Sequence, residues 1–265
     1  MRFLFVGGSQ RSGTTLLQKL LCLSPAATPK LAEASYLRML MQAYVQANMD
    51  FEHDTSSYFD DVEDLRQFHA GFVHAFLNRT LARCDSASTL VLKEPHLTQL
   101  FPQLFELVPE SRYVLIMRDP RDIMASMISV GERMAAQGQQ HFFQQRDITQ
   151  LSNLIKSFYA PTLNNQDQTY RSRTLVIRYE DLIQNTADLR TTLAGFTGLD
   201  LNVDESGIAT PREDKDQPRY QPWYTDNSER DINASSIGRY KQVLTAQEIE
   251  TAENTCSDII ELFHY

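Results

Sequence analysis

Cysteine is scarce in this sequence, and long apolar runs are missing. Cys22, Cys84 and Cys256 are far apart and odd in number among the 265 residues, so they form neither a disulfide framework nor a zinc ligand set. Five of the six histidines show no metal-ligand spacing, and we expect no metal. No apolar run approaches the length of a membrane span, and no signal peptide precedes the first expected strand. The expected setting is therefore the reducing cytoplasm.

Positive charge is also in the minority. The 25 Lys and Arg residues are outnumbered by 34 Asp and Glu residues, which gives a net charge of -9. This balance gives no general support for a nucleic-acid partner, although it permits a local basic pocket. A hydrophobic content of 42% is enough for one large core, and we expect a single domain over residues 1–265. The sequence leaves the oligomeric state open.

Short apolar runs alternate with helical patterns along the chain. The runs at 2–6, 89–92, 112–117 and 173–178 lack strict alternation, as parallel strands covered on both faces do. Strands that alternate with helices indicate right-handed βαβ units and a central parallel sheet. Helical spacing and capping residues predict helices over 14–22, 34–49, 65–83, 97–107, 120–134, 151–164, 187–196 and, behind a capping box, 246–263.

A glycine-rich turn joins the first expected strand to the first expected helix. The stretch VGGSQRSGTTLL (6–17) places Gly8 and Gly13 at the Walker A spacing, but Thr14 stands where that pattern requires lysine. Without this lysine the turn is not built to bridge β and γ phosphates. Two alternatives are a purely structural strand-to-helix turn and a nucleotide kinase with a degenerate loop.

Even so, the turn has the features of an anion site. The backbone amides of residues 8–15 and the helix start after Gly13 are predicted to bind one phosphate-like group. Thr14 and Thr15 add hydroxyl donors, and Arg11 adds a planar guanidinium. The expected fold class is therefore α/β, a P-loop-NTPase-like three-layer fold with a central parallel sheet.

A second cluster follows the third expected strand. In YVLIMRDPRDIMASM, Arg118 ends the strand and Ser126 lies eight residues later on the expected helix. Both are expected at the edge of the sheet where ligands bind in open α/β folds. They therefore predict a binding site for a second anion. Asp119 is disfavoured as a magnesium ligand by the arginine beside it. Two anion sites, neither built for a triphosphate, indicate a nucleotide that is phosphorylated at two places.

The combination resembles the sulfotransferases that use 3′-phosphoadenosine 5′-phosphosulfate (PAPS). SQRSGTTLL is similar to the 5′-phosphosulfate loop of that family, and RDPRDIMAS is similar to its 3′-phosphate motif. VIRYEDLI (176–183) and SSIGRYKQVL (235–244) match two further segments in the family's order. The loop is closest in style to tyrosylprotein sulfotransferases. Their Golgi relatives carry a membrane anchor that is not visible in this chain, which is more similar to a bacterial cytosolic member.

The resemblance implies roles for individual residues, with PAPS as donor and adenosine 3′,5′-bisphosphate (PAP) as product. The loop residues expected to contact the 5′-phosphosulfate are Arg11, Ser12, Gly13, Thr14 and Thr15. The residues expected at the 3′-phosphate side are Arg118, Ser126, Gly238 and Arg239, with Tyr179 near the nucleotide.

One position departs from the family pattern. Members of this subgroup can have a further basic residue four positions after the serine, where this chain has Val130. The 3′-phosphate must therefore find another cation, and Arg239 and Lys241 are the candidates.

Sulfuryl transfer is an in-line displacement at sulfur, in which an acceptor hydroxyl attacks and the 5′-phosphate leaves. Positioning and charge stabilisation should dominate, without a metal where cations cover the oxygens. The resemblance implies Glu33 as the base, because it lies 22 residues after Arg11, near the spacing of the catalytic glutamate in tyrosylprotein sulfotransferases. Lys93, at the end of the second expected strand, would contact the leaving oxygen. Arg11 completes the expected catalytic set.

A second candidate base is His96. Cytosolic sulfotransferases of small molecules use a histidine two residues after the corresponding lysine. Here the spacing is three, with Pro95 between the two, and we favour Glu33. The sequence leaves open whether Glu94 orients Lys93 or is a surface charge.

The acceptor cannot be identified from the sequence. Residues 34–83 and the long polar loop expected at 204–236 are the predicted walls of its site. The acceptor would be a small-molecule alcohol, a glycan or lipid hydroxyl, or a peptide tyrosine. In the second wall, Trp223 with Tyr220 and Tyr224 forms either an aromatic surface of the pocket or an ordinary surface patch.

Two other function classes compete with the transferase. One is a P-loop kinase or NTPase, against which Thr14 argues. The other is a sulfotransferase-like module that binds nucleotide without catalysis, against which the presence of both Glu33 and Lys93 argues.

Overall fold

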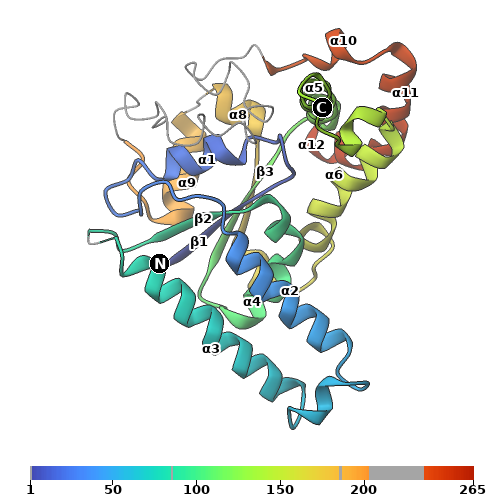
Figure 1. Cartoon of the computed structure of the whole chain (residues 1–265). Coiled ribbons are helices and arrows are strands. Elements are labelled where there is room, and N and C mark those ends of the chain that lie inside the picture. The colour runs from blue at the N-terminus through green and yellow to red at the C-terminus, as the bar shows by residue number, and fades with distance from the viewer. Residues whose placement is uncertain (1, 85, 185–186, 203–235) are drawn as a thin grey trace.

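A parallel sheet forms the centre of the computed structural model, which describes residues 2–84, 86–184, 187–202 and 236–265. Its strand order is β2–β1–β3–β4, and every pairing is parallel (Figure 1). This confirms the expected α/β class and all four expected strands. The strands are β1 (Phe3–Gly7), β2 (Leu90–Lys93), β3 (Arg112–Met117) and β4 (Thr174–Arg178).

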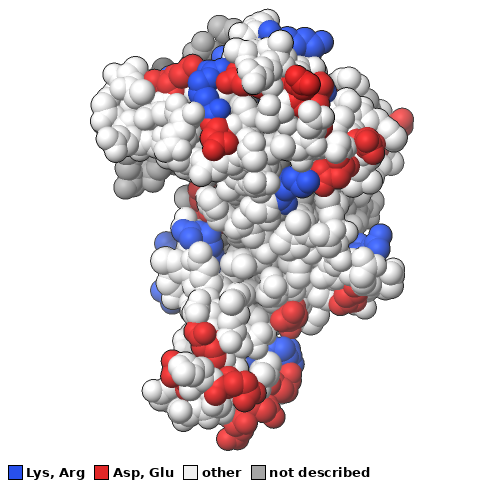
Figure 2. All heavy atoms as spheres, turned by 90° about the vertical axis from the view of Figure 1, so that its right-hand side faces the viewer, with Lys and Arg blue, Asp and Glu red and all other residues white. Residues whose placement is uncertain are grey.

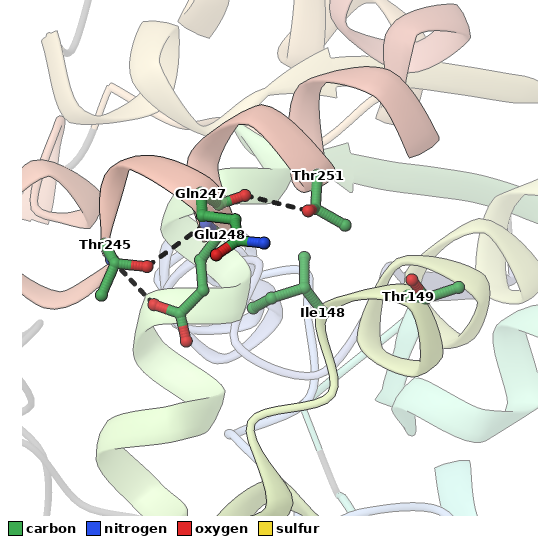
Figure 3. Close-up of a pocket in the computed structure, with 6 residues that line it drawn as sticks. All are labelled: Ile148, Thr149, Thr245, Gln247, Glu248 and Thr251. Carbon is green, nitrogen blue, oxygen red and sulfur yellow. Dashed lines mark hydrogen bonds between the residues drawn. The ribbon is translucent and has the colours of Figure 1, made fainter.

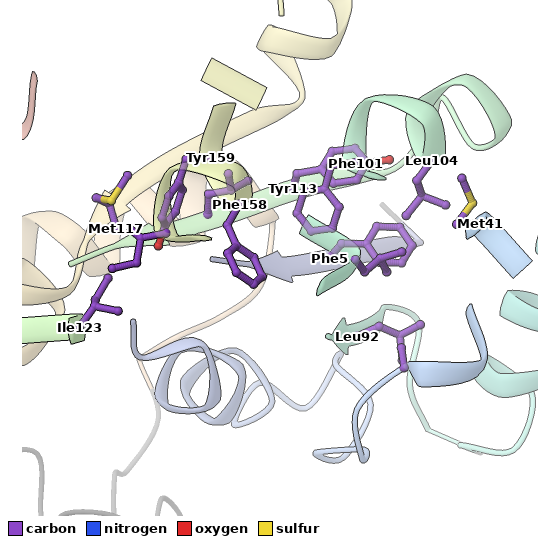
Figure 4. Packing of buried hydrophobic residues seen from close by; sticks show 14 of the residues in the cluster. Phe5, Met41, Leu92, Phe101, Leu104, Tyr113, Met117, Ile123, Phe158 and Tyr159 are labelled. Carbon is purple, nitrogen blue, oxygen red and sulfur yellow. The ribbon is translucent and has the colours of Figure 1, made fainter. Parts of the chain in front are cut away.

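The strands are buried on both faces, which explains why their sequences show no alternation of polarity. Along β1, Phe3 and Phe5 join one core cluster, whereas Leu4 and Val6 join the other. In the larger cluster the ring of Tyr113 from β3 stacks on Phe5 at 5.5 Å between centroids (Figure 4). Both faces of the sheet are therefore covered by helices.

Each face has its own set of helices. The smaller core cluster joins the sheet to α1 (Thr14–Leu21), α8 (Tyr179–Gln184) and α9 (Ala187–Thr197). The larger cluster joins it to α2 (Ser35–Met49), α3 (Val62–Leu81), α4 (Phe101–Leu107), α5 (Pro120–Ala136), α6 (Ile148–Leu163), α7 (Gln168–Ser172), α10 (Tyr240–Val243), α11 (Ala246–Thr255) and α12 (Ser257–Phe263).

Several helix boundaries differ from the prediction. The expected helix 97–107 is a 3-10 helix, η2 (Pro95–Leu100), followed by α4, whose first turn contains Pro102. The expected helix 246–263 is interrupted at Cys256, between α11 and α12. The capping box of Thr245 and Glu248 is confirmed. Short helices such as α7, α8 and α10 were missed because a segment of four to six residues shows no periodicity.

The hairpin of α2 and α3 extends away from the sheet (Figure 1). Acidic side chains gather at its free end, the lower end of the molecule in Figure 2. Between Met39 and Leu65 the chain has seven Asp and Glu residues and no Lys or Arg. Seven of the ten exposed large hydrophobic residues found in the described part of the chain lie on this hairpin: Tyr36, Met39, Met49, Tyr58, Val62, Phe68 and Phe72.

The second predicted acceptor wall falls largely outside the described residues. This applies to Trp223, Tyr220 and Tyr224, and only Ser236 at the end of that segment is described. Among the helices that the structure describes, none combines the length and apolarity that a membrane span needs.

Candidate active site

The carboxyl ends of the strands bring the predicted site residues to one edge of the sheet. Val6 of β1 lies opposite Lys93 of β2, and Met117 of β3 lies opposite Arg178 of β4. The glycine-rich loop after β1 therefore lies between the end of β2 and the end of β3. This is the edge where open α/β sheets bind ligands.

Hydrogen bonds from two other elements hold the glycine-rich loop. The amide of Gly8 donates to Oγ1 of Thr98 on η2 at 2.9 Å. The amide of Ser9 donates to the hydroxyl of Tyr159 on α6 at 2.9 Å, and this hydroxyl donates to the carbonyl of Ile116 on β3 at 3.0 Å. The loop is thus fixed before any ligand arrives.

These bonds correct the prediction that all amides of residues 8–15 face an anion. The amides of Gly8 and Ser9 are already used, and the amide of Ser12 donates to the carbonyl of Ser9 at 3.2 Å. The hydroxyl of Ser12 donates to the same carbonyl at 2.7 Å, and its side chain is fully buried. Ser12 therefore shapes the loop instead of facing a ligand. The amides at the start of α1, from Thr14 onward, lack intrahelical acceptors and are therefore available to donate to an anion.

Gly13 occupies a position that only glycine fits. Its φ is +103°, and a Cβ added there would lie 2.5 Å from Cδ2 of Tyr179. The close packing of the loop against the Tyr179 ring therefore depends on the missing side chain.

We expect Gly13→Ala to lower the free energy of unfolding by about 2–4 kcal/mol, because it combines a left-handed backbone with a clash against the ring. Chemical denaturation measures this change. The matched control is Gly71→Ala inside α3, where a Cβ meets nothing within 4 Å and helix propensity should add about 0.5–1 kcal/mol. Equal effects of the two substitutions would contradict the packing argument.

Arginine side chains join the loop to the second predicted anion site. Nε of Arg11 donates to Oγ of Ser126 on α5 at 3.0 Å. Nη1 of Arg118 donates to the carbonyl of Arg11 at 3.2 Å, and its guanidinium lies 4.6 Å from the ring centre of Tyr179. The structure therefore brings Arg11, Arg118, Ser126 and Tyr179 together, as the sequence predicted.

This part of the site is strongly electropositive. Burial, followed by the charges of Arg133, Arg118 and Arg239 in that order, lowers the pKa of Arg11 to about 10. The guanidinium groups of Arg133, Arg118 and Arg239 thus act on that of Arg11 at the edge of the sheet. Such a cluster is suited to a ligand with several negative charges.

The sequence prediction missed Arg133. It lies seven residues after Ser126, two turns along α5 and on the same face of the helix. Val130, at the position where the family can have a basic residue, is fully buried. Helical periodicity was the available signal, and it points to Arg133 as a substitute for that missing cation.

The segment that begins at Ser236 approaches the same arginines. The carbonyl of Ser236 accepts from Nη2 of Arg118 at 2.5 Å. The hydroxyl of Ser236 shares a hydrogen bond of 2.8 Å with the hydroxyl of Tyr179. Gly238 and Arg239 therefore lie on the Arg118 side, as predicted. Lys241, the other candidate cation, has its Nζ 5.8 Å from the ring of its neighbour Tyr240.

The two proposed catalytic groups meet at the end of β2. The amide of Ala34 donates to the carbonyl of Lys93 at 3.0 Å, so the residues before α2 run along the strand end. Nζ of Lys93 then reaches Oε1 of Glu33 at 2.6 Å. Lys93 is buried, whereas the side chain of Glu33 is half exposed. An exposed carboxylate beside a buried ammonium is accessible to an acceptor from solution.

His96 lies at the same opening. The side-chain amide of Gln10 in the loop donates to its Nε2 at 3.1 Å, and its ring packs on Phe158. Burial, and next the charge of Arg38, lowers the pKa of His96, while the charge of Glu33 raises it. His96 therefore contacts the loop, and the charge of Glu33 acts on its ring.

Glu94 is not a surface charge. It is buried, and its Oε2 accepts from the amide of Leu97 at 2.6 Å, which caps η2. Its Oε1 lies 3.6 Å from Nε of Arg38. Burial raises the pKa of Glu94 to about 7. By accepting from the amide of Leu97, Glu94 stabilises the start of η2, the element that also contains His96.

Comparison with known proteins decides the family. The model of the sulfotransferase family matches residues 4–203, about three quarters of the 265 residues. The chain belongs to the sulfotransferase family.

Curated relatives of this chain include two vertebrate proteins. Protein-tyrosine sulfotransferase 1 of Danio rerio is 25% identical over 207 residues, which are 76% of this chain and 54% of the relative. Protein-tyrosine sulfotransferase 2 of Gallus gallus is 26% identical over 204 residues, which are 75% of this chain and 52% of the relative. The chain thus spans about half the length of these relatives.

Solved sulfotransferases share the fold. The sulfotransferase domain from the curacin biosynthetic pathway superposes with a TM-score of 0.61 at 15% identity, over 97% of both chains. The sulfotransferase domain of the Synechococcus PCC 7002 olefin synthase gives 0.58 at 16% identity, over 96% of this chain and 94% of the other. A mouse sulfotransferase complexed with PAP gives 0.55 at 12% identity, over 98% and 84%. At these identities the likeness establishes the fold alone.

The carboxylate of Asp119 is already paired with an arginine side chain. It forms an ion pair of 2.8 Å with Nη2 of Arg121, and its Oδ1 accepts from the amide of Arg121 at 2.9 Å. It caps α5 in this way. Over the described ranges, no group of three or more His, Cys, Asp or Glu residues lies close enough to hold a metal ion.

A shallow pocket lies away from this site, where α6 and α11 begin (Figure 3). Its carboxylate, Glu248, completes the capping box of α11 and also pairs with Arg146 at 2.9 Å. None of the site residues predicted from the sequence lines it. The residues around it are Ile148, Thr149, Thr245, Gln247, Glu248 and Thr251.

Proposed function

We propose that this chain transfers a sulfuryl group from PAPS to an acceptor hydroxyl and releases PAP. The observation that carries the proposal is the convergence of four arginines at the edge of the sheet, around a phosphate loop that lacks its lysine. A donor with a phosphate at each end of its ribose presents charges to both halves of this cluster. Support also comes from the relatives that are named protein-tyrosine sulfotransferases, and from the related mouse structure that contains PAP.

The residues fit such a donor. We assign the 5′ side to Arg11, Gly13, Thr14 and Thr15, at the start of α1. We assign the 3′ side to Arg118, Ser126, Gly238 and Arg239, with Arg133 as an added cation and Tyr179 between the two sides. Ser12 supports the 5′ side indirectly, because its hydroxyl is bonded within the loop.

In the proposed reaction Glu33 takes the proton from the acceptor hydroxyl as its oxygen forms a bond to sulfur. The bond from sulfur to the 5′-phosphate oxygen breaks in line, and Lys93 donates to that leaving oxygen. The ion pair of 2.6 Å between Lys93 and Glu33 supports their action on one reacting centre. Arg11 neutralises charge that develops on the sulfuryl oxygens. His96 holds Gln10 in the loop and is the alternative base.

The α2–α3 hairpin is the proposed first wall of the acceptor site. Tyr36 begins this wall three residues after Glu33 and contacts Phe76 of α3, with 5.3 Å between ring centroids. The exposed rings of Phe68 and Phe72 continue it along α3 at 5.0 Å. An aromatic surface beside the base suits an acceptor with an apolar body. A small-molecule alcohol, a glycan or lipid hydroxyl and a peptide tyrosine all remain acceptors of this proposal.

Ligand affinity tests the proposed nucleotide. We expect PAP to bind at least about tenfold more tightly than AMP, because only PAP engages Arg118 and Ser126 as well as the loop, and charged hydrogen bonds contribute about 1.5–3 kcal/mol each. Thermal shift and calorimetric titration measure this, since a ligand at about 100 times its Kd stabilises the fold by about 2.7 kcal/mol.

The comparison ligand is ATP with magnesium. Equal affinities for PAP and AMP would refute the 3′-phosphate assignment. Tighter binding of ATP that disappears with a chelator would instead support a P-loop kinase or NTPase.

A further inference from the structure

We infer that Asp122 is a positioning residue, which fixes the backbone around Arg239 so that this arginine faces the 3′-phosphate. The inference rests on the proposed function, because it concerns the same nucleotide site. Asp122 lies on the first turn of α5, four residues after Arg118 and four before Ser126, on the face that carries the 3′ side. It is almost completely buried.

Both carboxylate oxygens of Asp122 bind the segment that starts at Ser236. Oδ2 accepts from the amide of Gly238 at 2.8 Å, and Oδ1 accepts from the amide of Tyr240 at 2.9 Å. The two bonds hold the residues on either side of Arg239. Gly238 has a φ of +73°, a left-handed conformation that turns the chain between Ser236 and α10. The direction of Arg239 therefore depends on this carboxylate.

A carboxylate is an unexpected group next to a phosphate site. Burial raises the pKa of Asp122, while Arg118 and the amides of Tyr240 and Gly238 lower it. Nη2 of Arg118 lies 3.8 Å from its Oδ2. On charge alone, a carboxylate here repels a phosphate and weakens PAP binding. Its presence is explained if holding the segment contributes more to PAP binding than its charge subtracts.

The opposite signs of these two effects give a decisive test. We expect Asp122→Asn to weaken PAP binding by at least about tenfold, because an amide nitrogen cannot accept from a backbone amide and one side of Arg239 is released. AMP binding should change by less than about threefold, since AMP has no 3′-phosphate. If charge dominates, the same variant binds PAP more tightly than the wild type. Calorimetric titration with PAP and AMP distinguishes these outcomes.

The ratio of PAP to AMP affinity separates positioning from a general loss of structure, which would weaken both ligands together. Asp181→Asn is the matched control, because Asp181 is a partly exposed carboxylate on α8 that lies 3.8 Å from Arg178. It should leave both affinities unchanged. Unchanged or tighter PAP binding by Asp122→Asn overturns the inference while the proposed nucleotide stands. Equal affinities of the wild type for PAP and AMP overturn both.

Hydrogen exchange on the wild-type chain provides a test that does not depend on a folded variant. We expect PAP to slow amide exchange in residues 236–244 by at least about fivefold more than AMP at equal saturation, because the 3′-phosphate engages the residue that Asp122 holds. Equal protection by the two nucleotides overturns the inference.

Discussion

Glu33→Gln is expected to reduce kcat by at least about 100-fold while the affinity for PAP stays within about threefold. The glutamine keeps the size of the side chain but cannot take the proton of the acceptor, and general-base catalysis contributes about 10²–10⁴-fold. The amide oxygen of the glutamine can still accept from Nζ of the buried Lys93, so this ammonium keeps a hydrogen-bond partner. Turnover with PAPS and an acceptor hydroxyl, together with a PAP titration, measures the two quantities.

Two further variants make the Glu33 result specific. Glu52→Gln changes an exposed glutamate at the acidic end of the hairpin and should leave kcat unchanged. His96→Ala removes the alternative base and should lower kcat less than Glu33→Gln does. The base would be His96 if Glu33→Gln retained most of its turnover while His96→Ala lost it.

Lys93→Met is expected to lower kcat by about 10²–10³-fold, the loss seen when one preorganised donor to a developing anion is removed. Methionine fills a similar volume, and Lys93 is buried beside a carboxylate that is half exposed. The remaining Glu33 can therefore be solvated, and stability should change little. Stopped-time assays of turnover and a thermal melt give the two measurements.

The proposed role of Lys93 differs from simple substrate binding. Because its donor bond strengthens as charge develops on the leaving oxygen, the loss should appear in kcat and leave KM for PAPS within about threefold. Lys156→Met is the control, because Lys156 pairs with Asp258 at 2.9 Å on a different part of the surface. A rise in KM with kcat unchanged would show that Lys93 only binds the donor.

Part of this site was predictable from local sequence. The glycine spacing of the loop, the buried strands and the rule that ligands bind at the carboxyl edge of a parallel sheet together placed Arg11, Arg118 and Ser126 at one edge. In the structure Arg11 and Ser126, 115 residues apart, share a hydrogen bond of 3.0 Å, so the two segments do meet at this edge. This succeeded because strand ends are recognisable locally and parallel pairing aligns them.

Contacts inside the loop were not predictable in the same way. The amides of Gly8 and Ser9 are consumed by Thr98 and Tyr159, from η2 and α6. Nothing in the motif shows which elements pack against it. The motif therefore overstated the number of donors that face the anion, and it gave Ser12 a direct role that its buried hydroxyl does not have.

By itself, the sequence determined the class of the fold, the edge that carries the site and the types of residue that end each strand. These follow from hydrophobic periodicity and from the chirality of βαβ connections, which act over short stretches of chain. Tertiary structure alone decided that Glu33 meets Lys93 across 60 residues, and that Asp122 holds Gly238 across 116. The reason is physical: such a bond depends on how two packed elements align, and alignment is set by side-chain packing across the whole core.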